Sequence, residues 1–278
     1  MLSLVSALAI GEHQAATDVH ATHRATPYLG FDRNEYPGDA NLAALHRTFA
    51  YTGYWLNNPP GAVHNSWAGK RKVVYSAGFG FLVLFNGRMF KQIQSFGDAK
   101  KLGTDDGDSA AQAAMREGFP PRTVIFLDQE EGGQLLPEQR NYLHAWVDAV
   151  TRAGFHAGVY CSGIAFRESS GTTVITAVDI HENAAGRKLL YWVANDACPP
   201  SPGCVYGKHV PQPADSGVPF ADVWQFVQSP RRRDFAAHCS NYNADANCYA
   251  PGIDPAQHLH IDLNTATSPD PSGGRGRE

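Results

Sequence analysis

Eight short runs of apolar, β-branched and aromatic residues recur along the chain, and each has the length of one strand. Amphipathic segments with a helical period fill the earlier gaps between them. The clearest is Pro137–Gly154, which places four large apolar residues on one face and has a glycine at its end. Strands that alternate with helices predict βαβ units and parallel pairing. The eight predicted strands are Tyr28–Asp32, Phe49–Trp55, Phe79–Phe85, Thr123–Asp128, His156–Cys161, Leu189–Ala194, Ala221–Phe226 and Leu259–Leu263.

The pattern changes after Leu189. Segments 195–219 and 227–255 are rich in Pro, Gly and Asn and have no helical period. The sequence therefore predicts an α/β fold, a TIM-like (β/α) barrel of eight strands whose last helices are missing or replaced by long loops. An open doubly wound sheet is the alternative, but no G-x-G-x-x-G follows the first strand. The other predicted helices begin behind Asp39 or lie within Trp67–Ala77, Asp105–Gly118 and Val174–Arg187.

Two carboxylates follow the fourth predicted strand directly, in the segment Thr123–Gly133. Asp128 and Glu130 are two residues apart, so their side chains point the same way if the backbone stays extended. Paired carboxylates at the end of a strand are what glycoside hydrolysis requires, one as the acid and one as nucleophile, base or stabiliser. A solvated strand end is the plain alternative.

Other strands also end in polar or aromatic residues. In a β/α barrel, the carboxyl ends of the strands meet at one mouth, where active sites lie. The carboxylates expected there are Asp32, Asp128, Glu130 and Asp262, and we interpret these four as catalytic candidates. Aromatic rings stack on the C–H faces of sugars, and amides bind hydroxyl groups. The expected substrate-binding residues are Tyr54, Trp55, Tyr160, Trp192, Asn195, Trp224 and Gln225.

The order of these strand-end motifs resembles the family 25 glycoside hydrolases, which are lysozyme-like muramidases. The motifs are Asp on strand one, D-x-E on strand four, G-V-Y on five, W-x-A on six, W-Q-F on seven and D-x-N on eight. The opening segment Gly30–Pro37 and Gly78–Phe81 resemble a sister group more closely, the glycoside-hydrolase-like domain of unknown function 1906, found in secreted bacterial proteins. The resemblance spans about 27–264 and implies a barrel that lacks its last helices.

The resemblance also implies roles for individual residues. Glu130 matches the muramidase general acid, and Asp128 matches the carboxylate that positions or stabilises the reacting sugar. Asp32 and Asp262 match the carboxylates of the first and last strands, and Tyr160, Trp192 and Trp224 match aromatic walls. The sequence departs from the muramidase pattern after Asp32, and an additional acid, Glu131, follows the D-x-E motif.

Composition limits the function further. The net charge of −4 and the pI of about 6.3 give no general attraction to nucleic acid or anionic membranes. The five cysteines favour two local disulfides, Cys198–Cys204 and Cys239–Cys248, with Cys161 buried and reduced, because the spacings are poor for zinc. Such disulfides imply an oxidising compartment.

The ends of the chain differ from the predicted barrel. Residues 1–26 form an N-terminal extension, in which Leu2–Ile10 resembles part of a secretory signal. A frayed helix is the alternative. The barrel domain is expected over 27–264, and the tail over 265–278, rich in Pro, Gly and Ser, is expected to be disordered. We therefore expect a secreted or extracytoplasmic monomer without a membrane span.

Three functions remain open from the sequence. The first is hydrolysis of bacterial cell-wall glycan (peptidoglycan) by carboxylates without a cofactor. The second is a carbohydrate-binding barrel without turnover. The third is a metal-dependent hydrolase that uses His258, His260 and Asp262, although we expect these histidines to lie deeper in the barrel than Asp262. Two further interpretations concern Arg231–Arg233, as a solvated rim or a contact for anionic glycan, and Glu35, as a site acid or a turn residue.

Overall fold

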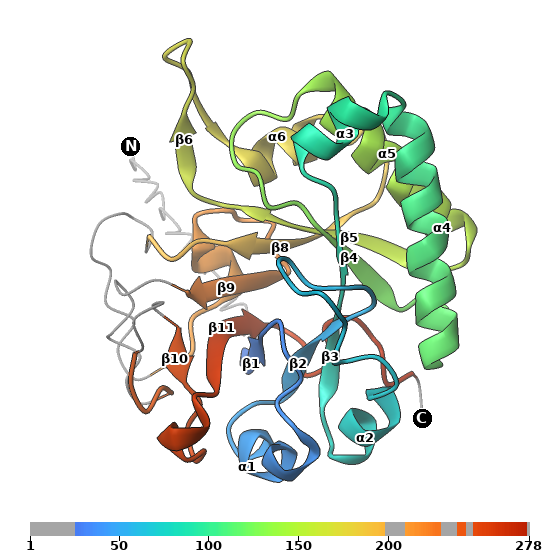
Figure 1. Cartoon of the computed structure of the whole chain (residues 1–278). Helices are drawn as coiled ribbons and strands as arrows, with labels where there is room; N and C mark the ends of the chain where they lie inside the picture. The colour runs from blue at the N-terminus through green and yellow to red at the C-terminus, as the bar shows by residue number, and fades with distance from the viewer. Residues whose placement is uncertain (1–25, 198–208, 229–237, 243–246, 277–278) are drawn as a thin grey trace, which may run out of the picture.

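Eight strands close into one barrel because the last strand pairs with the first (Figure 1). The protein is represented by a computed structural model that describes residues 26–197, 209–228, 238–242 and 247–276. All eight predicted strands are present, so the predicted barrel is confirmed. In barrel order they are β1 (Tyr28–Asp32), β2 (Tyr51–Trp55), β3 (Gly80–Asn86), β4 (Val124–Asp128), β5 (His156–Ser162), β8 (Leu190–Ala194), β9 (Val223–Val227) and β11 (His260–Ala266).

The direction of β11 differs from the prediction. The strands from β1 to β9 are parallel to their neighbours, but β11 is antiparallel to both β9 and β1. A parallel strand would need a crossover from the mouth back to the opposite end of the barrel. The described part of the connection instead contains β10 (Cys248–Tyr249), which pairs antiparallel with β11. The chain therefore enters β11 from the mouth.

Helices lie where the periodicity places them, with one addition. α1 (Leu42–His46), α2 (Arg71–Ser76), α4 (Ala99–Glu117), α5 (Pro137–Arg152) and α6 (Thr176–Glu182) match predicted segments, whereas α3 (Phe90–Phe96) was not predicted. A two-stranded hairpin of β6 (Ala165–Arg167) and β7 (Thr173–Ile175) also lies between β5 and β8 and projects from the barrel (Figure 1). After β8, the helical elements of the described residues are two 3-10 turns, η2 (Pro213–Ser216) and η4 (Pro255–Gln257).

The long helix α4 begins earlier than its predicted start at Asp105. Its N-cap is Asp98, whose side chain accepts a hydrogen bond from the backbone N–H of Lys101. Gly103 and Gly107 lower the intrinsic helix propensity of the first turns, which is why the prediction began later. A Cβ on Gly103 would lie 2.2 Å from the carbonyl oxygen of Tyr142. These glycines therefore let α4 pack directly on α5 (Figure 1).

Aromatic side chains fill the barrel interior. The rings of Phe126 on β4 and Trp192 on β8 lie 6.0 Å apart, although β5 separates these two strands in the sheet. The contact is possible because Gly158 on β5 has no side chain, and a Cβ there would lie 2.4 Å from the Phe126 ring. Tyr160 packs edge-on against Trp192 at 4.8 Å. Phe126, Tyr160 and Trp192 thus form the floor beneath the mouth.

The C-terminal segment is ordered as far as the structure describes it, in place of the expected disorder. Thr265 and Ala266 complete β11, and the following chain crosses the starts of β3 and β4. The buried Ser272 donates its backbone N–H to Phe81, and its carbonyl oxygen accepts from Val124. These partners come from distant strands, so the composition of the tail gives no sign of them.

Three sequence predictions concern cysteines and chain ends. The disulfide Cys239–Cys248 is present, and Cys161 is buried and unbonded, as predicted. Cys198–Cys204, the run Leu2–Ile10 and the basic run Arg231–Arg233 lie outside the described residues. Within the part of the chain that the structure describes, no helix is long and apolar enough to cross a bilayer.

Candidate active site

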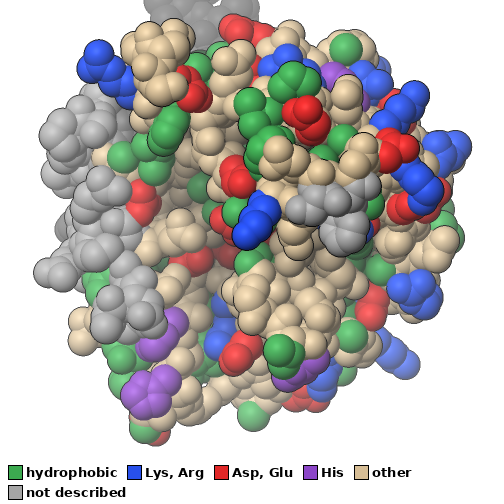
Figure 2. Space-filling view, turned by 45° about the horizontal axis from the view of Figure 1, so that its top comes forward, with side chains coloured by type: hydrophobic (Ala, Val, Ile, Leu, Met, Phe, Trp, Pro, Cys, Tyr) green, Lys and Arg blue, Asp and Glu red, His purple; other side chains and the backbone are tan. Residues whose placement is uncertain are grey.

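One pocket of about 730 Å³ opens at the carboxyl ends of the parallel strands, and it contains all four predicted carboxylates. Figure 2 shows acidic side chains gathered in a hollow of the molecular surface. The side chains from the predicted set that line the pocket are Asp32, Asp128, Glu130, Asp262, Trp55, Tyr160, Trp192 and Gln225. The strand-end argument therefore located the pocket.

Asp262 reaches the pocket by a route that the sequence did not indicate. It stands directly opposite Asp32 in the antiparallel pairing of β1 with β11. Because β11 runs inward from the mouth, Asp262 lies near its start, and Asn264 lies deeper, opposite Gly30. His260 consequently lies on the outer side of Asp262 and lines the pocket, so its predicted deeper position is wrong.

Asp32 is the centre of a buried polar network. Its Oδ1 accepts hydrogen bonds from Nε2 of Gln225 at 2.9 Å and from Nδ2 of Asn264 at 2.7 Å. Tyr160 donates its hydroxyl to Gln225, and Trp192 donates its indole N–H to Asn264. Burial raises the pKa of Asp32 to about 6, although the two amide donors lower it. The network therefore fixes four side chains from β5, β8, β9 and β11 relative to the carboxylate of Asp32.

Asp128 has no such support. Its side chain is 3% exposed, and neither carboxylate oxygen has a hydrogen-bond partner among the described residues. Burial raises its pKa well above the usual value, and the charges of Glu130 and Asp32 raise it further. A buried acceptor without a donor is costly, which is tolerated at sites where a ligand supplies the missing partner.

Glu130 and Asp262 differ in their surroundings. Glu130 lies beyond the end of β4 at the exposed edge of the pocket, and desolvation raises its pKa. Burial, followed by the charge of Asp32, raises the pKa of Asp262 well above its usual value, and a hydrogen bond from Nδ2 of Asn247 lowers it. The pocket thus keeps protons on carboxyl groups at pH values where exposed acids are ionised.

Three of the predicted substrate-binding residues are not in the pocket. The hydroxyl of Tyr54 lies within hydrogen-bond distance of two acceptors, the carbonyl of Trp67 and the carboxylate of Glu117, on the outer side of β2. Trp224 donates its indole N–H to the backbone of Asn195. The side chain of Asn195 donates to the carbonyl of Ser216. Side chains alternate along a strand, so Tyr54 and Trp224 point outward where their neighbours Trp55 and Gln225 line the pocket.

Several pocket residues were not predicted. They are Arg33, Asn34, Glu35, Pro60, Leu84, Asp196, Gln228, Asn247 and His260, and the buried Asn264 belongs to the network behind them. Asn264 was visible as the last residue of the D-x-N motif, and Glu35, considered only as an alternative, pairs with Arg33 at 3.7 Å. Asn247 carried no local signal, because only the fold brings it beside Asp262.

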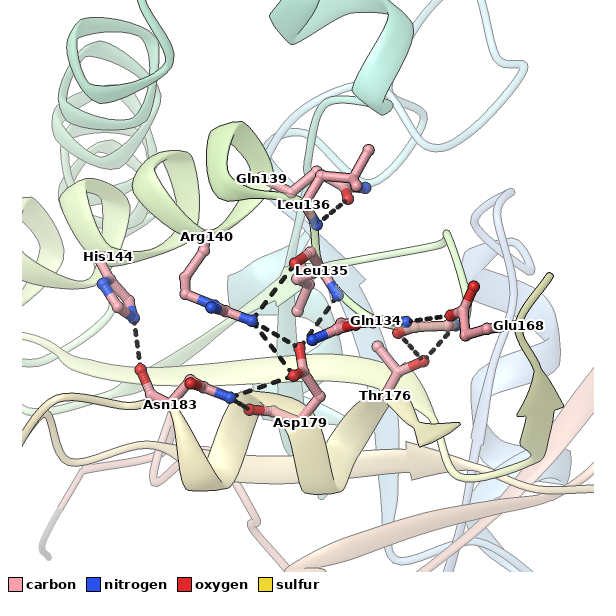
Figure 3. Close-up of polar contacts among 11 residues, drawn as sticks. Gln134, Leu135, Leu136, Gln139, Arg140, His144, Glu168, Thr176, Asp179 and Asn183 are labelled. Carbon is pink, nitrogen blue, oxygen red and sulfur yellow. Dashed lines mark hydrogen bonds and ion pairs between the residues drawn. The ribbon is translucent and has the colours of Figure 1, made fainter. Parts of the chain in front are cut away.

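The loop that follows Glu130 is held by a segment from elsewhere in the chain (Figure 3). Thr176 at the start of α6 accepts a hydrogen bond from the N–H of Gly133 at 2.9 Å and donates to its carbonyl at 3.0 Å. Glu168 accepts from the N–H of Gln134, and Asp179 accepts from that of Leu135. The inserted β6–β7–α6 segment therefore binds three consecutive residues of this loop.

Four further contacts, two at Asp179 and two at Glu131, stabilise this support. Asp179 is held by Arg140 of α5 at 3.2 Å and by the side chain of Asn183 at 3.1 Å (Figure 3). On the other side of the loop, Glu131 accepts hydrogen bonds from the backbone of Phe90 at 2.6 Å and from Gln139 at 2.7 Å. Glu131, the additional acid of the sequence, thus anchors the loop beside Glu130.

Among the described residues, no group of three or more His, Cys, Asp or Glu side chains is arranged to hold a metal ion. His258 and His260 face each other with ring centroids 6.4 Å apart, and His260 packs edge-on against Tyr249 at 4.6 Å. The proposed set of two histidines with Asp262 is therefore not arranged as a metal site in this part of the chain.

A closed eight-stranded barrel with an acidic pocket at its strand ends belongs to the TIM-like class, with the features of a glycoside-hydrolase-like protein. Residues 53–200, just over half of the chain, match the family described as Rv2525c-like, glycoside hydrolase-like domain. The chain belongs to this family. The matched range includes the D-x-E motif and extends from β2 to just beyond β8.

Solved structures are similar to this chain, and the first of the three named here supports the same fold. An uncharacterized protein from B. stearothermophilus is 16% identical, with a TM-score of 0.52 over 86% of this chain and 95% of that chain. A bacterial lysozyme from Streptomyces coelicolor is 13% identical, with a TM-score of 0.48 over 87% and 92% of the two chains. A family 25 glycosyl hydrolase from Bacillus anthracis is 11% identical, with a TM-score of 0.47 over 90% and 92%. No curated protein sequence matches the chain.

Proposed function

We propose that the protein is a glycoside hydrolase that cleaves bacterial cell-wall glycan, with Glu130 as the general acid. The observation that carries this proposal is the convergence of Glu130, Asp128, Asp32 and Asp262 in one pocket of a glycoside-hydrolase-like barrel. The aromatic residues Trp55, Tyr160 and Trp192 in the same pocket support a sugar as the ligand.

The proposed reaction begins with proton transfer from Glu130. Desolvation raises the pKa of Glu130, so its protonated form persists to higher pH than that of an exposed glutamate. Its carboxyl group donates a proton to the glycosidic oxygen as the bond to the anomeric carbon breaks. The sugar acquires oxocarbenium character, and carboxylates on the pocket wall stabilise the positive charge electrostatically. Asp128, together with Asp262 or Asp32, has this role. A water molecule then forms the new bond to the anomeric carbon and gives its proton to a carboxylate of the pocket, which completes hydrolysis.

Release of dye-labelled peptidoglycan fragments tests the proposal. The wild type should release dye, and Glu130→Gln should lose about 10²–10⁴-fold of that activity, because the amide is nearly isosteric but donates no acidic proton. Asp105→Asn, on an exposed position of α4 paired with Lys101, is the matched control and should retain activity. Pull-down on insoluble cell wall should be equal for all three proteins. Equal release by Glu130→Gln and the wild type would refute the assignment of the acid.

A carbohydrate-binding barrel without turnover is the second candidate. The raised pKa values of Asp128 and Asp262 favour it, because a protonated carboxyl group stabilises a positive transition state poorly. Retained pull-down on cell wall without dye release by any variant would support this function over hydrolysis.

The proposed place of action is outside the cytoplasm. The disulfide Cys239–Cys248 supports an oxidising compartment, where such bonds persist. Insoluble cell-wall polymer is also accessible there, and the pocket opens to the surface at the barrel mouth. Fractionation of the source cells, followed by detection of the protein with its disulfide intact, tests this location.

A further inference from the structure

The pocket holds more carboxyl groups than glycoside hydrolysis needs. Two carboxylates suffice for acid catalysis and charge stabilisation. Six acidic side chains line this pocket: Asp32, Glu35, Asp128, Glu130, Asp196 and Asp262. Among the described residues that line the pocket, Arg33 is the one lysine or arginine, and it lies 3.7 Å from Glu35. The described lining therefore provides no second such cation for Asp32, Asp128, Glu130 and Asp262.

The buried part of this pocket offers hydrogen-bond acceptors to a ligand. Asp128 is 3% exposed, and both of its oxygens lack a donor among the described residues. The neighbouring charges that act on it come from Glu130 and Asp32, which are also acids. Asp32 already receives its two amide donors at one oxygen, Oδ1. A ligand group that donates several hydrogen bonds and carries positive charge would satisfy this wall.

An ammonium group has those properties, since it has three donors and no acceptor. A negatively charged sugar would meet like charge at Glu130 and the aspartates, which is unfavourable in a partly desolvated pocket. An N-acetylated sugar offers one amide N–H and brings a carbonyl acceptor with it. The pocket volume, with Trp55 and the partly exposed Tyr160 in its wall, fits a sugar ring rather than a bare ion.

We propose that the pocket selects a glycan whose bound unit carries a free amino group, a de-N-acetylated amino sugar, and that Asp128 receives its ammonium. This inference rests on the proposed function for the choice of a glycan as the ligand, but it concerns recognition and not turnover. Burial raises the pKa values of Asp128, Asp262 and Asp32, and a bound ammonium opposes this shift because a neighbouring cation favours the ionised carboxylate.

Calorimetric titration with defined oligosaccharides tests the inference. The probes are a β-1,4-linked glucosamine tetramer, the N-acetylglucosamine tetramer of the same length, and tetralysine as a cation without sugar rings. The wild type should bind the glucosamine tetramer at least about tenfold more tightly than either other probe at low salt. The preference over the N-acetylated tetramer should decrease at high salt because ions screen charge attraction.

Substitutions assign the preference to the pocket. Asp128→Asn should reduce the ratio of the two sugar affinities to near one, and Asp262→Asn should reduce it in part. Asp105→Asn on α4 removes an equal charge outside the pocket and should preserve the ratio. Circular dichroism confirms the fold of each variant, and the wild-type ratio remains a test even if Asp128→Asn does not fold.

The outcomes separate this inference from the proposed function. Equal or tighter binding of the N-acetylated tetramer, no binding of either sugar, or equal binding of tetralysine would overturn the inference. An unchanged ratio in folded Asp128→Asn would overturn the role of Asp128. A wild type that selects the glucosamine tetramer but releases no fragments from any glycan would support the inference while hydrolysis fails.

Discussion

Asp32 and Asp262 stand opposite each other across the antiparallel pair β1–β11 and line the same pocket. The reversal of β11 brings the third residue of this strand level with the last residue of β1. Burial raises the pKa of both groups, and the charge of Asp32 raises the pKa of Asp262 further. The pair therefore concentrates acidity at the mouth and costs folding stability when both groups ionise.

This cost predicts how stability depends on pH. The pKa of Asp32 is about 6 in the folded chain, compared with 3.8 for the unperturbed group. The folded chain binds more protons over this interval, so the contribution of Asp32 to the free energy of unfolding is fully present below pH 3.8. It decreases as pH rises through about 6. The shift corresponds to up to about 3 kcal/mol at roughly 1.4 kcal/mol per pH unit.

Asp32→Asn should remove this dependence, since the amide oxygen can still accept from Gln225 and Asn264. Urea unfolding should show the variant to be more stable than the wild type at pH 7, with a smaller difference at pH 4. Asp105→Asn serves as the control and should stay close to the wild type at both pH values. A difference that grows toward pH 4 would contradict the direction of the shift.

Substitution of two buried tryptophans tests glycan binding and folding stability separately. Trp192 and Trp224 are both fully buried, and each indole N–H donates one hydrogen bond at 2.9 Å. Replacement by Phe should cost each protein about 1–3 kcal/mol of unfolding free energy, because an acceptor loses its donor. Only Trp192→Phe should weaken glycan binding, since Trp192 lines the pocket and Trp224 does not.

Parallel urea unfolding and glycan titration measure both quantities for the two tryptophan variants. Equal loss of glycan affinity in Trp224→Phe would show that the outer residue contributes to binding and would contradict the assignment of the two faces.

The contact between Thr176 and Gly133 predicts a positioning role for α6. Thr176→Val keeps the shape of the side chain but leaves the N–H and carbonyl of Gly133 without their partner. Amide hydrogen exchange at 133–135 should become faster, and the free energy of unfolding should fall by about 1–3 kcal/mol. Thr176→Ser should restore slow exchange.

If the chain is a hydrolase, Thr176→Val should lower kcat more than it raises KM, because this loop carries Glu130. Unchanged exchange in folded Thr176→Val would show that the other loop contacts suffice to position it.

The disulfide Cys239–Cys248 should stabilise both the fold and one pocket wall. It closes a short loop with a sequence separation of 9, for which the loss of chain entropy corresponds to about 2–3 kcal/mol. Asn247, which holds Asp262, is the neighbour of Cys248. The double variant Cys239→Ser, Cys248→Ser should therefore lose unfolding free energy of this size and some glycan affinity.

Unfolding and titration of the wild type with and without a reductant give a second measurement of the disulfide contribution. An effect of reductant on the double variant would report the predicted Cys198–Cys204 bond, so the additional effect on the wild type measures the contribution of Cys239–Cys248. A wild type whose stability is insensitive to complete reduction of this bond would contradict the prediction.

Local sequence was sufficient for most of the barrel. Strands are short apolar runs and α5 has a clear period, so both follow from contacts close in the chain. The hairpin β6–β7 and α3 were missed because they are short and largely polar or exposed. The ordered tail was missed because Ser272 and Asp270 gain order only through hydrogen bonds to β3 and β4.

The sequence by itself determined that carboxylates and aromatic residues would end the strands, because residue type and strand position are local properties. The tertiary structure decided which of them share the pocket. It turned Tyr54 and Trp224 outward, left Asp128 without a donor among the described residues, and reversed β11 so that Asp262 lies opposite Asp32. The direction of a strand and the side to which its side chains point depend on pairing between distant segments. Residue identity along one strand does not encode that pairing.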